Sequence, residues 1–372
     1  MTAKRLSKTV VVKIGSSTLT DAQGALRLET VSALVAEVCE LQLEGYRMLL
    51  VSSGAVSSGM GVLQRRRPKE IIDLQAAAAV GQGHLFHTYA ELFSCFEVVT
   101  AQVLLTAYDV SARAQYNNAR NTLRRLLQWR VVPIINENDT TSTDELCFGD
   151  NDALAAQVAL LVKADLLVLL TDIEGLYTAN PNEDEEASLI NMVEDINQLN
   201  HVKIGNTGSL GSGGMGSKIG SARIATSGGV ETVIACGSLP GVLRACVSGE
   251  AIGTRFPARS IGLHDYKLWL LFGKPTNGSV VVDEGAAKAI KSKGSLLPVG
   301  VIAVEGEFVA GDAVMVADKQ GLELAKGLVN YSSKEIDQVK GLQSSQVEGM
   351  LPHTSPEVIH RDYMVQVQNF GH

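Results

Sequence analysis

A regular alternation of strand-like and helix-like segments over about the first 250 residues most constrains the fold of this chain. Short apolar runs rich in β-branched residues predict strands, and apolar residues recurring every three or four positions predict the helices between them. The predicted strands are Thr9–Ile14, Arg47–Val51, Val98–Leu105, Val131–Ile135, Leu166–Leu170 and Val230–Ala235. This pattern predicts an α/β fold, a three-layer αβα sandwich around a mostly parallel sheet.

The alternation of predicted strands and helices ends after Gly253. A length of 372 residues also favours more than one domain. A Pro- and Arg-containing segment, Thr254 to Ser260, is expected to be a hinge, and short strands separated by glycines follow Asn277. The expected organisation is an α/β domain over 1–257, a linker over 258–276 and a small β-rich domain over 277–372.

Composition limits the partners and the compartment. The formal net charge is −8, so no global basic field favours nucleic acid or an anionic membrane. No apolar run approaches the roughly 20 residues that span a bilayer. The five cysteines form no Cys-x-x-Cys pair, which is typical of reduced thiols. We expect a cytoplasmic protein that does not bind membranes.

The highest density of charged and polar side chains follows the predicted strand that ends at Ile135. Six carboxylates lie between Glu137 and Asp152, after which an apolar helix is predicted from Ala153. Open α/β sheets place ligand sites at such strand ends, although Asn and Asp are also ordinary turn formers and a plain surface loop is the alternative. The cluster from Asp150 to Asp152 favours a binding site because it adjoins a helix start, where free N–H groups meet polar ligands.

Three other strand ends carry small or polar residues. Lys13 precedes Gly15 and two serines, Ser53 precedes Gly54, and Leu170 precedes Thr171 and Asp172. Glycine frees backbone N–H groups, and a nearby ammonium suits phosphate oxygens, so these ends predict a shared polar site. Tight turns with helix caps are the alternative.

The glycine-rich segment 211–218 matches two better-known motifs only superficially. It fits G-x-G-x-x-G, and it misses G-x-x-x-x-G-K-[ST] because Ser217 and Lys218 stand in swapped order. Both motifs need a strand directly before the glycines, and His201 to Leu210 shows no strand pattern. What remains is a glycine-rich loop that brings Lys218 to a triphosphate at the first turn of a helix, with a flexible linker as the alternative.

Together these motifs resemble the amino-acid kinase family, and the resemblance covers essentially the whole chain. The matching segments are Val12-Lys-Ile-Gly-Ser16, Ser52-Ser-Gly-Ala55, Ile135-Asn-Glu-Asn-Asp139, Gly149-Asp-Asn-Asp152, Leu169-Leu-Thr-Asp172 and Gly213-Gly-Met-Gly-Ser-Lys218. The tail from about Val282 resembles a PUA domain. The acidic loop and this tail together are more specific than any single motif.

The resemblance implies roles for individual residues. Lys13 and Lys218 would flank the transferred phosphoryl group as catalytic residues, and Asp152 would hold both lysines. No residue is predicted as a direct metal ligand. The residues implied for the amino-acid substrate are Ser53, Gly54, Asn136, Asp139, Asp150 and Asn151. Those implied for ATP are Lys13, Gly15, Thr171, Asp172, Ser212, Gly213, Gly214, Met215, Gly216, Ser217 and Lys218.

The resemblance also implies an activity. The branch of the family that the chain is similar to uses ATP and Mg²⁺ to phosphorylate the side-chain carboxylate of L-glutamate to L-glutamyl 5-phosphate, the first step of proline biosynthesis. It implies feedback inhibition by proline, a homo-oligomer (dimer or tetramer), and glutamate-5-semialdehyde dehydrogenase (glutamyl phosphate reductase) as a partner that consumes the labile product.

Two alternatives stay open at this point. The same chemistry on aspartate, N-acetylglutamate or another acceptor is one of them. The other is an RNA-binding or RNA-modifying protein, because PUA-like domains occur in RNA enzymes. The tail from Asn277 holds eight Lys and Arg against twelve Asp and Glu, net −4, which argues against RNA as the main partner.

Overall fold

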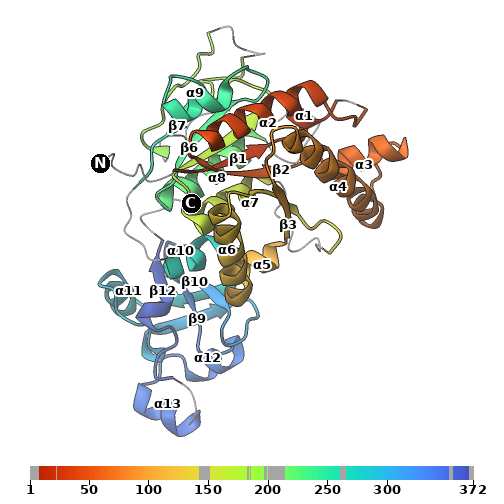
Figure 1. The fold of residues 1–372 in the computed structure, drawn as a ribbon. Helices are drawn as coiled ribbons and strands as arrows, with labels where there is room; N and C mark the ends of the chain where they lie inside the picture. The colour runs from red at the N-terminus through yellow and green to blue at the C-terminus, as the bar shows by residue number, and fades with distance from the viewer. Residues whose placement is uncertain are drawn as a thin grey trace, which may run out of the picture. The chain divides into compact units, whose positions relative to one another are not determined.

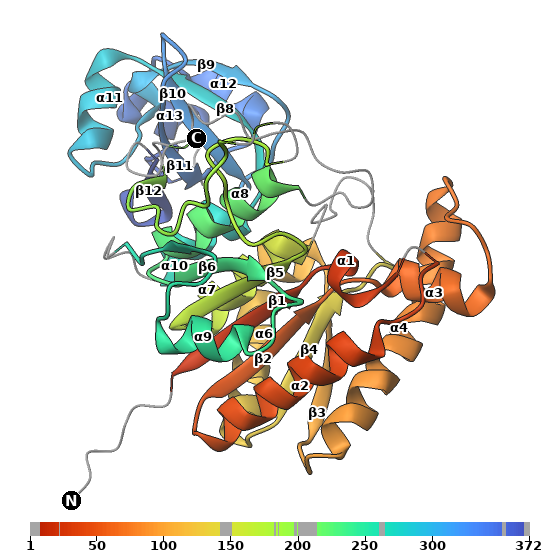
Figure 2. The ribbon, with the colours of Figure 1, turned by 90° about the horizontal axis from the view of Figure 1, so that it is seen from above.

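A seven-stranded sheet organises the N-terminal part of the computed structural model (Figures 1 and 2). Its strands lie in the order β3-β4-β2-β1-β5-β6-β7, and every neighbouring pair is parallel except β6 with β7. The predicted mostly parallel sheet is therefore confirmed. The strands are β1 (Thr9–Ile14), β2 (Arg47–Ser52), β3 (Thr100–Leu105), β4 (Val132–Glu137), β5 (Leu166–Thr171), β6 (Glu231–Cys236) and β7 (Thr254–Phe256).

The structure describes residues 8–141, 151–199, 214–259 and 265–367, except 22, 182, 183, 185, 197, 198 and 352–354. It divides into two compact units, residues 1–261 and residues 262–372. The division falls inside the segment 258–276 that we proposed as a linker. Within the described part of the chain, no helix is long and apolar enough to cross a membrane.

Helices cover both faces of the seven-stranded sheet, which completes the expected three layers. α2 (Leu28–Leu43), α4 (Ile71–Ser94) and α9 (Val242–Ser248) pack on one face, and Figure 2 shows α2 and α9 on its near side. α6 (Arg113–Gln128), α7 (Asn151–Val162) and α8 (Met215–Ser227) lie on the other. The short helices are α1 (Ser16–Leu19), α3 (Ala55–Leu63) and α5 (Ala107–Ser111).

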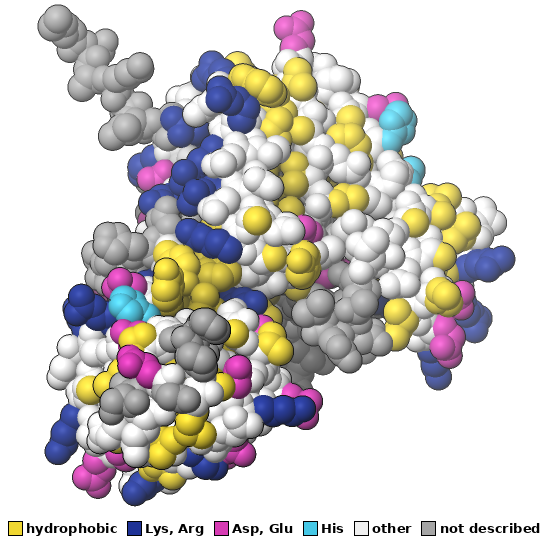
Figure 3. Space-filling view, turned by 90° about the horizontal axis from the view of Figure 1, so that it is seen from below, with side chains coloured by type: hydrophobic (Ala, Val, Ile, Leu, Met, Phe, Trp, Pro, Cys, Tyr) yellow, Lys and Arg dark blue, Asp and Glu magenta, His cyan; other side chains and the backbone are white. Residues whose placement is uncertain are grey.

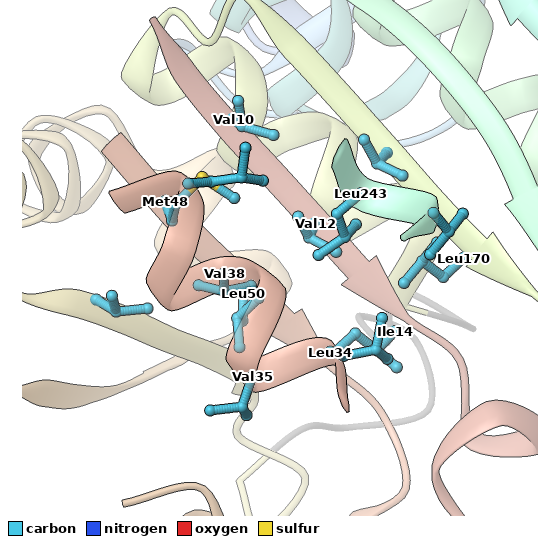
Figure 4. Packing of buried hydrophobic residues seen from close by; sticks show 14 of the residues in the cluster. Val10, Val12, Ile14, Leu34, Val35, Val38, Met48, Leu50, Leu170 and Leu243 are labelled. Atoms are coloured by element: carbon cyan, nitrogen blue, oxygen red, sulfur yellow. The ribbon is translucent and has the colours of Figure 1, made fainter. Parts of the chain in front are cut away.

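The central strand β1 is buried along its whole length, as expected of a parallel strand covered on both faces. Val10, Val12 and Ile14 point toward α2, where Leu34 packs in the same apolar cluster (Figure 4). Successive side chains of a strand point to opposite faces. Lys13 therefore points to the α7 side of the sheet, away from this cluster.

Helices α3 and α4 form a hairpin held together by small residues. A Cβ added to Gly59 would lie 1.9 Å from the Ala77 carbonyl oxygen, and one added to Gly81 would lie 1.8 Å from that of Ala55. Only glycine permits backbones to approach this closely. The connection, residues 64–70, holds four Lys and Arg, and Figure 3 shows basic side chains at this end of the hairpin.

The C-terminal unit contains a five-stranded sheet in the order β12-β11-β10-β8-β9, so the expected small β-rich domain is confirmed. Val280, Val316, Tyr331 and Ile336 are buried in its core. Its strands are β8 (Thr276–Val282), β9 (Val301–Glu305), β10 (Ala313–Asp318), β11 (Glu323–Leu328) and β12 (Met364–Gln366). Its helices are α10 (Asp265–Leu268), a π-helical turn (Trp269–Gly273), α11 (Glu284–Lys291), α12 (Ser333–Val339) and α13 (Ser344–Met350).

The segment 254–260 and the start of α7 differ from expectation. The segment 254–260, expected to be a hinge, begins with β7, which pairs antiparallel with β6. Thr254 is buried and its hydroxyl oxygen accepts the backbone N–H of Leu176 at 2.7 Å, which fixes this segment to the rest of the unit. Helix α7 begins at Asn151 rather than Ala153, so Asn151 and Asp152 belong to its first turn.

Candidate active site

Two buried lysines share one buried carboxylate. Lys13 Nζ lies 2.5 Å from Asp152 Oδ1, and Lys218 Nζ lies 3.1 Å from Asp152 Oδ2. The side chains are 5%, 8% and 0% exposed for Lys13, Lys218 and Asp152. Buried charges require partners, and two ammonium groups directed at one carboxylate concentrate positive charge at this point of the sheet. This arrangement suits phosphate oxygens.

Three different elements deliver these side chains. Lys13 is the penultimate residue of β1, Asp152 is the second residue of α7, and Lys218 lies in the first turn of α8. An acidic residue in a first helical turn is stabilised by the helix dipole. Since α7 and α8 pack against each other and α7 packs on β1, the three charged groups meet on one face of the sheet.

A chain of amide hydrogen bonds lies beside this cluster. Asn151 Nδ2 donates to the Ser52 carbonyl oxygen at 2.5 Å and to Asn136 Oδ1 at 2.6 Å. Asn136 Nδ2 in turn donates to Gln82 Oε1 at 2.6 Å. The chain thus ties the ends of β2 and β4 to α7 and α4. The sequence interpretation missed Gln82, because a single glutamine in a helical segment carries no signal of its own.

The end of β2 is fixed to the end of β1. The backbone N–H of Ser53 donates to the Ile14 carbonyl oxygen at 3.1 Å. Gly54 follows with a φ of 90° as the N-cap of α3, a left-handed conformation that favours glycine. The Ser52 hydroxyl lies 3.2 Å from the buried Tyr89 hydroxyl on α4. Ser53 and Gly54 are therefore held next to the strand that carries Lys13.

Asp139 lies two residues after the end of β4 and is half-buried. Burial, and then the negative charge of Glu137, raise the pKa of Asp139 to about 6 from an ordinary value of 3.8. A carboxylate whose charge is poorly solvated in this way gains from a cationic ligand. Asp139 suits an ammonium group.

The end of β5 lies on the other side of β1. Thr171 is buried and its hydroxyl donates to Asp172 Oδ1 at 3.1 Å, while Asp172 is exposed. On the neighbouring strand end, a Cβ added to Gly15 would lie 3.5 Å from the Leu170 carbonyl oxygen and 3.7 Å from Lys13 Nζ. The backbone at Gly15 therefore passes close to both β5 and the lysine.

Some of the predicted site residues cannot be placed. Asp150, Ser212 and Gly213 lie outside the described residues. Gly214 is the N-cap of α8, and Met215, Gly216 and Ser217 form its first turn together with Lys218. A Cβ at Gly216 would have no atom within 4 Å, so the described residues leave the start of α8 uncrowded. Among the described residues, no group of three or more His, Cys, Asp or Glu side chains is arranged to hold a metal ion.

Comparison with known proteins identifies the family. The amino acid kinase family matches residues 8–236, and the PUA domain matches residues 278–351. A glutamate 5-kinase of Caldanaerobacter subterraneus is 44% identical over 363 residues, which cover 96% of this chain and 98% of that protein. A glutamate 5-kinase of Synechocystis is 46% identical over 376 residues, which cover 99% and 100%. The chain belongs to the glutamate 5-kinase group of the amino acid kinase family.

The resemblance to the amino acid kinase family, which was inferred from the sequence motifs, is therefore confirmed. A solved structure of UMP kinase from Bacillus anthracis is 14% identical and superposes with a TM-score of 0.50, covering 68% of this chain and 97% of that chain. At this identity the similarity shows a shared fold. The amino acid kinase fold was predicted, and so was the phosphotransferase class.

Proposed function

We propose that this kinase transfers the terminal phosphoryl group of ATP to the side-chain carboxylate of L-glutamate, which gives L-glutamyl 5-phosphate and ADP as the first step of proline biosynthesis. The observation that supports the proposal is that Lys13 and Lys218 both pair with Asp152. This charged cluster has the amide network of β2 and β4 on one side and the polar end of β5 on the other. Relatives at 44% and 46% identity over nearly the full chain support glutamate as the acceptor.

The acceptor needs no general base. A glutamate side chain has an ordinary pKa of about 4.3, so its carboxylate is already ionised at neutral pH. One of its oxygens forms a bond to the terminal phosphorus while the bond from that phosphorus to the bridging oxygen of ADP breaks. The task left to the protein is in-line positioning and electrostatic stabilisation.

Lys13 and Lys218 provide the stabilisation. Negative charge spreads over the oxygens of the transferred group, and two buried ammonium groups interact with it more strongly than they would in water. Asp152 fixes both cations and reduces their mutual repulsion, so it acts through the lysines.

The two substrates occupy opposite sides of β1. In open α/β sheets ligands bind where the strand order reverses, and here β1 stands between β2 and β5. We assign Ser53, Gly54, Asn136, Asp139, Asp150 and Asn151 to glutamate, with Asp139 as a partner of its ammonium group. We assign Gly15, Thr171, Asp172 and residues 212–218 to ATP.

Mg²⁺ fits the donor set on the nucleotide side. Its preferred ligands are oxygens, and it is usually held by one or two carboxylates together with water and substrate phosphates. Asp172 offers an exposed carboxylate beside the Thr171 hydroxyl. When bound, the ion would neutralise charge on the phosphates of ATP.

Further properties of the relatives' branch are carried to this chain as proposals. They are feedback inhibition by proline, a homo-oligomer, a cytoplasmic location where ATP and glutamate are available, and delivery of the acyl phosphate to a glutamyl phosphate reductase. Acyl phosphates hydrolyse readily, which favours an enzyme that consumes the product quickly.

An acceptor assay tests the function. The purified protein is incubated with ATP, Mg²⁺ and hydroxylamine, which traps an acyl phosphate as a hydroxamate, and with glutamate, aspartate, N-acetylglutamate or UMP as the acceptor. We expect glutamate to give far more hydroxamate and ADP than the others. Equal hydroxamate from glutamate and aspartate would contradict the proposal, and ADP release with UMP alone would assign a different acceptor.

A further inference from the structure

Gln82 lies on α4 at the end of the amide network and is half-buried. Its Oε1 accepts Asn136 Nδ2 at 2.6 Å. Among the residues that the structure describes, the Gln82 side chain forms no other hydrogen bond, so both N–H groups of Nε2 are available as donors. The orientation of this amide decides what it can bind.

Backbone groups fix the orientation of every amide in the network. The Ser52 carbonyl only accepts, so the atom of Asn151 that faces it is nitrogen. The backbone N–H of Glu137 only donates, at 2.9 Å, so the atom of Asn136 that it reaches is oxygen. The same Asn136 oxygen accepts the second N–H of Asn151.

The polarity of Gln82 follows from these two anchors. With its oxygen turned toward Glu137 and Asn151, Asn136 must present nitrogen to Gln82, so the contacting atom of Gln82 is its oxygen. Gln82 is left with an N–H₂ group to offer. Asn151 uses both its hydrogens, which leaves its Oδ1 as an acceptor.

The position of Gln82 selects which end of glutamate it faces. Asn136 lies on β4, two strands away from Lys13 on β1, which is on the order of 10 Å at the usual spacing between strands. The reacting carboxylate must lie near the lysines. Gln82, which contacts Asn136, is therefore close to the opposite end of the acceptor, where an amino acid carries its α-carboxylate.

The packing of α4 holds Gln82 at this place. Gly81, its neighbour, approaches the Ala55 carbonyl so closely that a Cβ would lie 1.8 Å from that oxygen. Ala55 directly follows Gly54, so this turn of α4 adjoins the end of β2.

We propose that Gln82 is a specificity-determining residue that donates through Nε2 to the α-carboxylate of the acceptor, while Asn151 presents Oδ1 to its ammonium group. The inference rests on the proposed function and deepens it. A neutral amide held in a fixed orientation distinguishes a carboxylate acceptor group from an amine, because only the former accepts its N–H groups.

The test is the substitution Gln82→Glu, which keeps an oxygen for Asn136 and replaces the donor by a negative charge. Hydrogen bonds to charged groups contribute about 1.5–3 kcal/mol, which corresponds to roughly 10- to 150-fold in affinity. We expect the KM for glutamate to rise at least about 10-fold, with the KM for ATP within about twofold of the wild type because ATP binds across β1. Gly83→Ala is the matched control, since a Cβ there meets no atom within 4 Å.

A second ligand separates specificity from a structural role. 4-Aminobutyrate is glutamate without its α-carboxylate, and its inhibition constant against glutamate is measured for the wild type, Gln82→Glu and Gln82→Ala. We expect both substitutions to weaken the binding of glutamate much more than the binding of 4-aminobutyrate. Equal loss for both ligands would reduce Gln82 to a support for Asn136 and overturn the assignment.

The outcomes also distinguish the two proposals. A wild-type protein that forms no trapped product with glutamate would overturn the function and the role of Gln82 together. An active wild type with an unchanged glutamate KM in Gln82→Glu would overturn only the role of Gln82.

Discussion

Lys13 Nζ lies 2.5 Å from Asp152 Oδ1, and both side chains are almost fully buried. An ion pair in such a place gains little net stability, because desolvation offsets much of its attraction. Its value here is positional. The carboxylate holds one ammonium from the sheet and one from α8, so two cations are fixed side by side where an anion can bind.

Replacing Asp152 by asparagine should damage both activity and stability. Two buried ammonium groups would lose their counter-charge, and breaking a buried pair costs about 3–5 kcal/mol. We expect turnover to fall by at least ~100-fold and urea unfolding to shift to lower concentrations. Asp195→Asn is the control, because Asp195 is 43% exposed in its pair with Arg259, where exposed pairs contribute about 1 kcal/mol or less. Similar unfolding of the two variants would argue against the buried network.

Lys218→Ala should separate catalysis from acceptor binding. Removing one of the two cations should lower turnover by ~100-fold or more, as the loss of a single transition-state donor does in other enzymes. Glutamate should still raise the thermal unfolding temperature, since ligands that bind the native state stabilise it by mass action. Lys319→Ala, at an exposed position, is the control. Normal turnover in Lys218→Ala would remove this lysine from the site.

Asp139 predicts a pH dependence on the acceptor side. Burial and Glu137 raise the pKa of Asp139 to about 6, and only the ionised form attracts an ammonium group. We therefore expect the KM for glutamate to rise as pH falls below about 6, approaching ~10-fold per pH unit. In Asp139→Asn the KM for glutamate should be high and nearly constant between about pH 5 and 8. If the KM of that variant changed with pH as steeply as that of the wild type, the pH dependence would belong to another group.

The same shift predicts the sign of a stability effect. Because the folded protein disfavours the ionised form, Asp139 destabilises it above about pH 6, and this penalty disappears as pH falls toward 3.8. Without ligand, Asp139→Asn should unfold at a higher temperature than the wild type at pH 7.5. At pH 4 the two should unfold at similar temperatures.

Gly81 and Gly83 offer a matched pair on one helix. Alanine at position 81 would place its Cβ 1.8 Å from a backbone oxygen of α3, whereas alanine at 83 meets nothing within 4 Å. Overpacking costs about 1–3 kcal/mol, while alanine in an open helical position stabilises by roughly 0.5–1 kcal/mol. Chemical denaturation should therefore separate the variants in opposite directions, and equal stabilities would contradict the close packing of α3 on α4.

Much of the fold could be predicted because it depends on local patterns. The strand predicted over Thr9–Ile14 has those bounds in the structure, since a central parallel strand is apolar on both faces. β4 extends beyond the predicted Ile135 to Asn136 and Glu137, because partners from α4 and α7 satisfy Asn136. No single-sequence pattern contains those partners.

Some site residues could likewise be predicted from local sequence, whereas others depend on tertiary contacts. Lys13, Asp152 and Lys218 stand at strand and helix ends, where their types already suggest phosphate chemistry, and the structure brings them within ion-pair distance. Gln82 lies in the middle of a long helix, 54 positions from its partner Asn136. Only tertiary packing brings these two amides together.

The place of β1 between β2 and β5 gives the kinase a modular design. Acceptor groups are assigned to the β2 and β4 side, nucleotide groups to the β5 side, and only the lysine–aspartate cluster serves both. A change of acceptor therefore requires substitutions only on the β2 and β4 side of the sheet. The nucleotide groups on the β5 side and the lysine–aspartate cluster stay unchanged. A scaffold divided in this way can diversify its substrates without rebuilding its chemistry.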